Sequence, residues 1–269
     1  MRRVIALQEA GLLDRLRNAE LAVRNGQSME EARSKLMQTS CELSLDKWIT
    51  QDAKMKLLKD YIRQLYHRHD PVLITGPTGT GKELLARALE KEGSPFIAVN
   101  CGGLSRDLVP SIFFGSIKGA YTGSVETREG LLVAAKEGII FLDEIAELPL
   151  ELQATLLRAI QEGEVYKIGS TTPSKIHCRF VCATRHDLES LVERNLFRED
   201  LYGRLFIHHL KVTGLKDRQE DIPLIAASPA ESLSWNEPIA QEFYPTIFKY
   251  NVRGIQAYIA RMKTKNNYE

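Results

Sequence analysis

The chain has 269 residues, enough for one large or two unequal domains, and its 43% hydrophobic content can supply a substantial buried core. Its 36 basic and 35 acidic side chains leave a formal net charge of +1, which excludes a global electrostatic field that draws the protein to nucleic acid or anionic lipid. The amino terminus lacks the apolar stretch and cleavage site of a signal peptide, and no window reaches the ~18 consecutive apolar residues of a membrane span. We therefore expect a cytoplasmic protein without a membrane partner, in which the four cysteines are reduced thiols.

Residues 1–44 are predicted to form a helical amino-terminal extension. Apolar residues recur there at near-helical spacing, and Asn25-Gly26 supplies a stop signal. A second helical run follows from Met29 to about Thr39. From Trp48 onward the sequence changes in character, and short β-rich runs begin to alternate with helical patterns.

This alternation defines a predicted core over residues 45–220. The expected strands are Pro71–Thr75, Phe96–Asn100, Gly138–Leu142, Arg179–Ala183 and Leu205–Val212. The helices between them include Glu83–Glu92 and Leu150–Glu162. Strands that are apolar at nearly every position are typical of a parallel sheet buried on both faces, so we predict an α/β layered domain. Its ligands are expected at the carboxyl ends of the strands. Residues 221–269 turn helical again and predict a small separate unit.

The first predicted strand runs directly into a glycine-rich loop and then a helix. The loop consists of Gly76, Pro77, Thr78, Gly79, Thr80, Gly81 and Lys82. This is the context that a P-loop requires, because the glycines let backbone N–H groups surround phosphates and Lys82 reaches the terminal ones. Glu83 stands where the pattern has Ser or Thr, so magnesium must be held by other groups or through water. The alternative is a glycine-rich turn with a chance lysine.

A second motif follows some sixty residues later, where an apolar strand delivers Asp143 and Glu144 side by side. A nucleotide hydrolase needs one carboxylate to hold Mg²⁺ and one to polarise the attacking water. We assign Asp143 to Mg²⁺ and Glu144 to the role of catalytic base. Adjacent acids at a strand end are otherwise ordinary residues of a helix start, and the preceding P-loop favours the catalytic interpretation.

Together these motifs resemble the AAA+ domain of bacterial enhancer-binding proteins, which activate sigma-54 promoters. The resemblance covers about residues 45–223. Its most specific element is similar to the family's Gly-Ala-Phe-Thr-Gly-Ala loop, and here consists of Gly119, Ala120, Tyr121, Thr122, Gly123 and Ser124. In family members this loop contacts sigma-54, so the resemblance implies the same contact here. The alternative is a plain surface turn. Upstream, Ser116 and Ile117 replace a His-Glu pair common in the family.

The resemblance also implies roles for single residues. Asn100 matches the asparagine that restrains the catalytic glutamate, with a simple strand cap as the alternative. Thr184 falls at the first sensor position, where a strand-end side chain detects the γ-phosphate, and Arg185 replaces the asparagine that usually follows. Arg253 lies in a segment similar to the second sensor of the family's lid helix, although a surface arginine explains it about equally well.

The segment Phe197–Leu205 resembles the family's FREDLYYRL signature, whose two arginines reach the ATP of the neighbouring subunit. The resemblance thus assigns Arg198 and Arg204 to catalysis across a subunit boundary, and it implies a ring, most often a hexamer. As an alternative, these arginines pair with Glu199 and Asp200 on a helix surface.

We therefore expect an AAA+ P-loop NTPase, with a parallel sheet flanked by helices and a shortened helical lid over residues 221–269. The resemblance implies an ATPase that uses ATP and Mg²⁺ to remodel the sigma-54 RNA polymerase holoenzyme. DNA is contacted only indirectly, because no DNA-binding unit is visible. Two alternatives stay open: an AAA+ remodeller of a different protein client, and a nucleotide-dependent assembly module that does not hydrolyse ATP.

Overall fold

The computed structural model describes residues 40–103, 109–120, 125–228 and 235–266. The helices predicted over residues 1–39 lie outside this part of the chain, and the boundary predicted at residue 44 falls within the helix α3 (Ser40–Lys47). The next helix, α4 (Ala53–Leu65), begins after Asp52, whose side chain accepts a hydrogen bond from the backbone N–H of Met55 at 2.8 Å. This cap satisfies one of the N–H groups that a helix start leaves unpaired.

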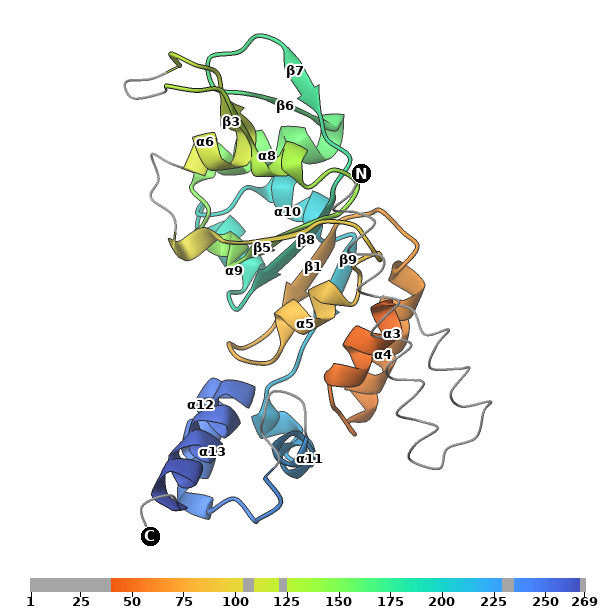
Figure 1. The fold of residues 1–269 in the computed structure, drawn as a ribbon, viewed down its shortest axis with the longest axis vertical. Helices are drawn as coiled ribbons and strands as arrows, with labels where there is room; N and C mark the ends of the chain where they lie inside the picture. Colours follow the sequence, from red (N-terminus) through yellow and green to blue (C-terminus); the bar gives the residue numbers. More distant parts are fainter. Residues whose placement is uncertain (1–39, 104–108, 121–124, 229–234, 267–269) are drawn as a thin grey trace.

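A five-stranded parallel sheet in the order β2-β5-β8-β1-β9 forms the centre of the molecule (Figure 1). Its strands are β1 (Val72–Thr75), β2 (Phe96–Asn100), β5 (Ile139–Asp143), β8 (Arg179–Thr184) and β9 (His208–Lys211). The sheet confirms the predicted α/β fold class. β1 lies between β8 and β9. The loop that follows β1 therefore begins inside the sheet, at the edge where the carboxyl ends of the strands meet.

The last strand is shorter than predicted. Leu205 ends the helix α10 (Glu199–Leu205) with a fully buried side chain, and the strand begins only at His208. An apolar run that closes a helix and opens a strand has no internal boundary that periodicity can detect.

One predicted helix is also shorter, while another has the predicted bounds. The helix expected over Glu83–Glu92 is α5 (Lys82–Arg87), because the chain turns through Gly93, at φ 75°, before it enters β2. The helix α8 (Leu150–Glu162) begins and ends where the sequence predicts. Its carboxyl end is closed by Gly163 in the left-handed conformation, the usual helix stop.

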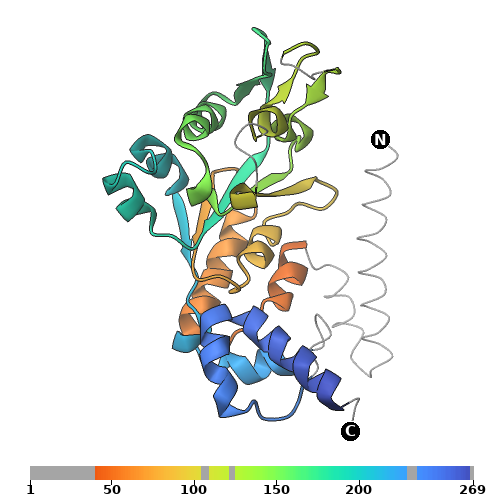
Figure 2. The same ribbon diagram turned by 90° about the vertical axis from the view of Figure 1, so that its left-hand side faces the viewer.

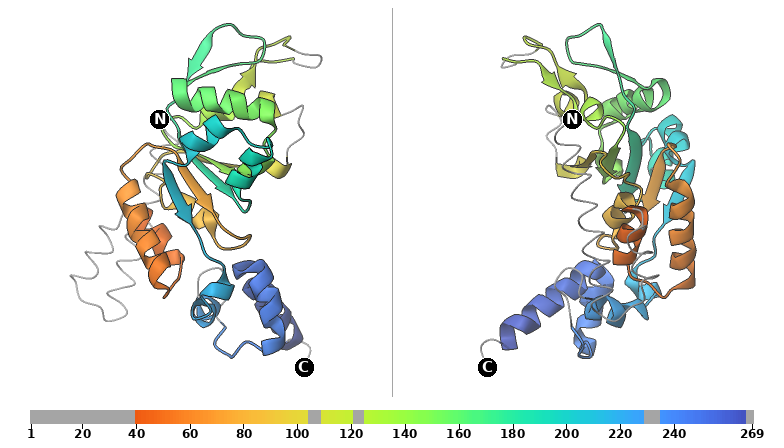
Figure 3. Two further views of the ribbon diagram at one scale, coloured as in Figure 1. Left: turned by 180° about the vertical axis from the view of Figure 1, so that it is seen from behind. Right: turned by 45° about the vertical axis from the view of Figure 1, so that its right-hand side comes forward.

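Each face of the sheet has its own core. In β1, Leu73 packs in one core, whereas Val72 and Ile74 pack in the other, as the two-residue period of a strand requires. The first core lies against α8, α10 and three short helices, which are α6 (Val109–Phe114), α7 (Leu131–Ala134) and α9 (Leu188–Glu193). The second lies against α3, α4 and α5, on the other side of the sheet (Figure 3).

Two β-hairpins extend from one end of the α/β domain. They are formed by β3 (Gly115–Ser116) with β4 (Arg128–Glu129), and by β6 (Glu164–Tyr166) with β7 (Pro173–Lys175). A bridge between Ser116 and Ile168 joins them. The first hairpin carries the Gly119 loop, of which residues 121–124 lie outside the described part of the chain.

A helical lid lies at the opposite end of the molecule from the hairpins, with the sheet between them (Figure 2). Its helices are α11 (Asp221–Ala227), α12 (Tyr244–Tyr250) and α13 (Val252–Asn266). They enclose a third core of Leu215, Ile222, Ile225, Ala226, Trp235, Ile247, Ile255, Tyr258 and Ile259. A lid shortened in sequence thus still buries its own apolar cluster. Within the described ranges, no helix combines the length and the apolar character needed to cross a bilayer.

All four cysteines are unpaired and buried. Burial raises the pKa of the Cys41 thiol to about 11 and that of Cys178 to about 12. The Cys101 thiol also reaches a pKa of about 12, chiefly through burial and further through the nearby negative charges at the end of β5. For Cys182, which is fully enclosed, burial raises the pKa well above its ordinary value.

Candidate nucleotide-binding site

The glycine-rich loop joins β1 to α5 and folds around its own lysine. Lys82 is the first residue of α5, and its side chain is buried, with Nζ donating to the carbonyl oxygens of Gly76 at 2.8 Å and Pro77 at 3.1 Å. Burial lowers the pKa of Lys82, and the negative charges of Asp143 and Glu144 oppose this shift. The ammonium group is therefore held by the two loop carbonyls, and the charges of both carboxylates act on it.

None of the three glycines of this loop can be replaced without displacing a neighbour, which for Gly76 is the carbonyl oxygen of Val212. Gly79, at φ 77°, lies so close to the carbonyl oxygen of Tyr250 in the lid that a Cβ atom would collide with it. At Gly81, at φ 90°, a Cβ would lie 2.7 Å from Nε1 of Trp48. The loop is thus packed between the lid and the segment that precedes α4.

The two acidic residues stand at the end of β5, with Glu144 in an unusual backbone conformation. Its φ and ψ are 52° and 50°, in the left-handed region that non-glycine residues rarely occupy. Two hydrogen bonds hold it there: Asp143 Oδ1 accepts from the N–H of Glu144 at 3.0 Å, and the carbonyl of Glu144 accepts from Glu147 N at 2.9 Å. Strained residues of this kind cluster at functional sites.

The Glu144 carboxylate has one buried oxygen without a partner. Oε2 is inaccessible and forms no hydrogen bond within the described residues, while Oε1 lies 3.9 Å from Nε of Arg185. A buried acceptor left unpaired is costly, so it marks a place where a water or ligand group fits.

A cavity of about 620 Å³ opens between the P-loop, the end of β5 and the lid. This volume is in the range of small-molecule sites. The sequence-predicted residues that line it are Thr78, Gly79, Gly81, Lys82, Glu83, Asp143, Glu144 and Arg253. The structure therefore brings the phosphate loop, both carboxylates and the lid arginine to one site. Gly76, Pro77 and Thr80 belong to the loop without lining the cavity.

Glu83 lines this cavity from α5 and Arg253 lines it from α13. Glu83 accepts hydrogen bonds from Nη2 and Nε of Arg87 at 2.8 and 3.1 Å, one helical turn along α5. Its carboxylate is thus paired along the helix surface, which leaves Asp143 as the better placed ligand for Mg²⁺. Arg253, in the first turn of α13, is near enough to Lys82 for its charge to contribute to the lowered pKa of that lysine.

Asn100 ends β2 and Thr184 ends β8, the two strands that flank β5, and both side chains make local contacts. Asn100 Oδ1 accepts from the N–H of Gly102 at 3.0 Å, which is the strand cap considered as its alternative role. Thr184 is fully buried, and its Oγ1 accepts from the N–H of His186 at 3.0 Å. Neither lines the cavity, so their assignment to catalysis stays a prediction.

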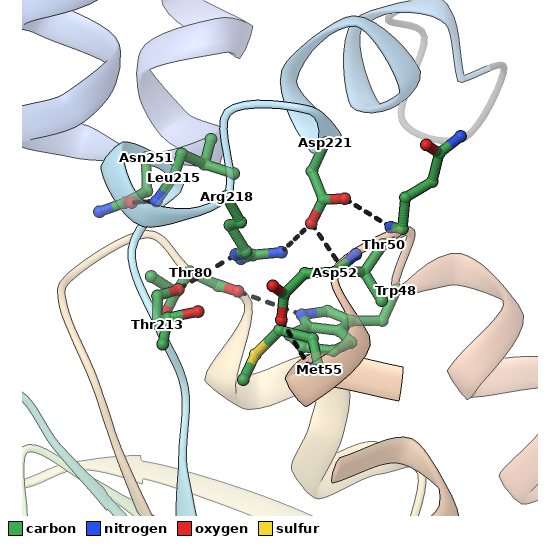
Figure 4. A network of polar contacts seen from close by, with 11 residues as sticks. Trp48, Thr50, Asp52, Met55, Thr80, Thr213, Leu215, Arg218, Asp221 and Asn251 are labelled. Atoms are coloured by element: carbon green, nitrogen blue, oxygen red, sulfur yellow. Dashed lines mark hydrogen bonds and ion pairs between the residues drawn. The ribbon is translucent and has the colours of Figure 1, made fainter. Parts of the chain in front are cut away.

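A buried ionic network joins the lid to the segment before α4 (Figure 4). Arg218 is 1% exposed, its Nη1 lies 2.8 Å from Asp221 Oδ2, and its guanidinium group stacks 5.2 Å from the Trp48 ring. Asp221 also accepts hydrogen bonds from Thr50 Oγ1 and from the N–H of Gln51. Hydrogen bonds to the remaining polar atoms offset the cost of burying such a pair. Here Nε of Arg218 donates to Thr213 O at 3.1 Å, whereas Nη2 is buried without a partner among the described residues.

Trp48 and Asn251 extend this network to the phosphate loop. The indole Nε1 of Trp48 donates to the carbonyl of Thr80 at 3.1 Å. The Asn251 side chain is fully buried, and its Nδ2 donates to Thr78 O at 2.9 Å while its Oδ1 accepts from Leu215 N at 2.7 Å. Figure 4 shows the contact of Trp48 with Thr80 and that of Asn251 with Leu215.

A family model described as the sigma-54 interaction domain matches residues 48–211. The chain belongs to this family. Its curated relatives include the response regulator protein PilR of Pseudomonas aeruginosa, 44% identical over 176 residues, which are 64% of this chain and 40% of PilR. Another is the transcriptional regulatory protein GlrR of Escherichia coli, 44% identical over 182 residues, which are 66% of this chain and 41% of GlrR. The chain thus spans about two fifths of the length of these relatives.

A similar solved structure is NtrX from Brucella abortus in complex with ATP, with a TM-score of 0.71 and 26% identity. The match covers 93% of this chain and 60% of that one. The expected AAA+ P-loop NTPase fold is confirmed, and the likeness extends over nearly the whole chain.

The family's arginines lie on α10, outside the cavity. Arg198 precedes the helix and forms two hydrogen bonds with Asp200, at 2.7 and 3.0 Å, as in the surface-pair alternative. Arg204 is exposed and has no ion-pair partner among the described residues. Their action on a neighbouring subunit stays a prediction.

Of the loop predicted to contact sigma-54, Gly119 and Ala120 are described, whereas Tyr121, Thr122, Gly123 and Ser124 lie outside the described residues. Ala120 closes a turn by donating to the carbonyl of Ile117 at 3.2 Å. The hairpin that carries the loop is at the far end of the molecule from the lid (Figure 1).

Sequence reasoning missed the roles of Trp48, Arg218, Asp221 and Asn251. The sequence contains one indication of the ionic pair, which is that Arg218 and Asp221 are three residues apart beside an apolar helix. Their burial depends on the packing of the lid against the segment before α4, which no local pattern encodes.

Proposed function

We propose that this chain hydrolyses Mg·ATP and uses the energy to remodel the sigma-54 RNA polymerase holoenzyme. The observation that carries the ATPase proposal is the cavity that combines the phosphate loop, Asp143 and the partnerless Oε2 of Glu144. Membership of the sigma-54 interaction domain family supports the choice of client.

The residues present fit a magnesium nucleotide. A glycine loop at a helix start can offer its backbone N–H groups to phosphate oxygens, and Lys82 supplies positive charge beside them. Asp143 would hold Mg²⁺, which when bound neutralises phosphate charge. Glu144 is the general base, since its carboxylate lines the cavity and its Oε2 has no hydrogen-bond partner among the described residues.

The proposal places a second set of groups on a neighbouring subunit. Arg198 and Arg204 are exposed on α10, away from the cavity of their own chain, so they are available to an adjacent copy. A positive charge supplied in this way offsets charge that develops on the transferred phosphoryl group. The active form is then a ring, which we propose to be a hexamer, with Thr184 and Arg253 as sensors of the nucleotide.

The loop Gly119–Ser124 is proposed as the contact to sigma-54, with Tyr121 and Thr122 as its central residues. Its sequence is the most specific resemblance to the family, and the hairpin position separates it from the cavity. A cytoplasmic location and indirect contact with DNA through the polymerase complete the proposal.

The experiment measures ATP turnover, nucleotide affinity by calorimetry and retention of sigma-54 with ADP or with ADP and aluminium fluoride. Lys82→Ala should abolish nucleotide binding. Glu144→Gln should bind ATP but turn over at least ~10²-fold more slowly, whereas the exposed control Glu151→Gln should not. Thr122→Ala should keep turnover and lose sigma-54.

The alternatives predict other outcomes. Turnover without retention of sigma-54 in any nucleotide state would indicate an AAA+ remodeller of a different client. Nucleotide binding without turnover at any protein concentration would indicate an assembly module that does not hydrolyse ATP.

A further inference from the structure

The exit of β8 lies beside the catalytic carboxylate. Arg185 follows the last residue of β8, and its Nε is 3.9 Å from Oε1 of Glu144. The next residue, His186, reaches back in the same direction, with Nε2 3.3 Å from Oε1 of Glu147. That histidine contact meets the distance of an ion pair without the geometry of a hydrogen bond. Two consecutive side chains thus face two acids of the turn after β5.

The two oxygens of Glu144 are in different environments. Oε1 faces the Arg185 guanidinium group, whereas Oε2 is buried with no partner among the described residues. Glu144 lines the nucleotide cavity and Arg185 does not. The arginine therefore pairs with one oxygen of the carboxylate, and its charge also helps to lower the pKa of Lys82.

The residue that sequence resemblance assigns to this task has another contact. Asn100 Oδ1 accepts a hydrogen bond from the N–H of Gly102, and the Asn100 side chain is exposed. Since Glu144 Oε2 has no hydrogen-bond partner, the Asn100 amide does not restrain that oxygen in this structure. The group in position to orient the carboxylate is Arg185.

An ion pair of this kind adds little to folding stability. The Arg185 side chain is 54% exposed, and exposed pairs contribute weakly because water screens them and both side chains lose freedom. Its effect is on orientation, because small displacements of a catalytic group are expensive for turnover.

We propose that Arg185 is a positioning residue that pairs with Oε1 of Glu144 and fixes the orientation of the carboxylate toward the attacking water. This inference rests on the proposed ATPase function. In this inference a charged side chain, Arg185, restrains Glu144, which is the role that the resemblance assigns to Asn100. Arg185 acts through Glu144 and does not touch the nucleotide.

The test compares Arg185→Gln and Arg185→Lys with Arg158→Gln, which removes an exposed arginine of α8 away from the cavity. Arg185→Gln should lower kcat ~10-fold or more, by loss of orientation, with little change in KM. Arg185→Lys should restore part of the rate, because it keeps the charge. Arg158→Gln should match the parent, and all thermal midpoints should stay unchanged.

A double variant decides whether Arg185 acts through Glu144. In a Glu144→Gln background, where single-turnover rates measure the residual hydrolysis, Arg185→Gln should have less than a ~2-fold further effect, because the group it positions is already absent. An equal fall in both backgrounds would overturn the inference, since it would mean that Arg185 acts directly on the phosphates.

A measurement independent of turnover separates this inference from the proposed function. In protein labelled with ¹³C-glutamate, the Glu144 carboxyl resonance, identified by its loss in Glu144→Gln, should move in Arg185→Gln and stay in Arg158→Gln. An unmoved resonance refutes the pairing whatever the turnover. A parent that shows no turnover refutes the ATPase proposal while the resonance still decides the pairing.

Discussion

Asn251 fastens the lid to the phosphate loop, and its removal should be measurable as a loss of stability. The side chain is fully buried at the start of α13, where it joins the backbone of Leu215 to that of Thr78. A second lid contact lies beside it, because the N–H of Val252 donates to the carbonyl of Gly79 at 3.0 Å. Asn251→Ala deletes both side-chain hydrogen bonds and leaves the backbone contact.

The expected loss follows from the two groups left behind. Leu215 N is buried, so losing its acceptor costs roughly 1–3 kcal/mol. Thr78 O is only partly buried, so water can replace its donor at a smaller cost, about 0.5 kcal/mol. Asn251 has φ 55° and ψ −130°, which alanine tolerates less well, by about 1 kcal/mol. We therefore expect Asn251→Ala to lower the free energy of unfolding by about 3 kcal/mol.

Urea denaturation followed by tryptophan fluorescence and by circular dichroism gives this free energy, provided that the two transitions coincide. Asn251→Gly is the matched control, because it loses the same hydrogen bonds but adopts the positive φ without strain. It should be about 1 kcal/mol more stable than Asn251→Ala. Equal stability of the two variants, or a loss below about 1 kcal/mol in both, would refute the reasoning.

Three further predictions test other contacts. Trp48→Phe keeps an aromatic ring beside the guanidinium group but loses the hydrogen bond to Thr80, so urea denaturation should show a loss of about 1 kcal/mol; an unchanged midpoint would contradict this. Burial lowers the pKa of His209, so the folded state resists its protonation, and stability should fall as the pH drops from the unfolded pKa near ~6.5 toward the folded value. His209→Gln should flatten that fall, and an equally steep one would contradict the assignment. Mixing inactive Arg204→Ala with inactive Glu144→Gln should restore some ATPase, because mixed rings contain interfaces with both groups intact; no recovery at any ratio in confirmed rings would count against action in trans.

Much of the sheet could be predicted from sequence because its signals are local. The apolar runs of β1, β5 and β8 have the composition of strands buried on both faces, and the glycine pattern after β1 has one common use. The paired acids Asp143 and Glu144 could also be predicted locally, because they are recognised by their position at the end of a strand. Their meeting with Lys82 at one cavity follows from parallel topology, in which strand ends share an edge.

What escaped prediction depends on contacts between distant segments. Trp48 reads as a helix-flanking apolar residue, yet it lies over Arg218, 170 residues along the chain. Arg253 could be a surface residue on its sequence alone, and only the packing of α13 against the P-loop places it at the cavity. Asn100 was assigned by resemblance, and its hydrogen bond to Gly102 is set by the turn after β2, which the family motif does not describe.

The burial of all four thiols makes this chain a convenient host for site-specific probes. A maleimide reacts with the thiolate, and pKa values of about 11 for Cys41 and about 12 for Cys101 leave almost none of it at neutral pH. A single cysteine introduced at exposed Lys118, and another on the exposed surface of α13, would therefore take up dyes without removal of the native thiols. Because the hairpins and the lid lie at opposite ends of the molecule, energy transfer between such dyes reports directly on whether nucleotide moves one end relative to the other (Figure 2).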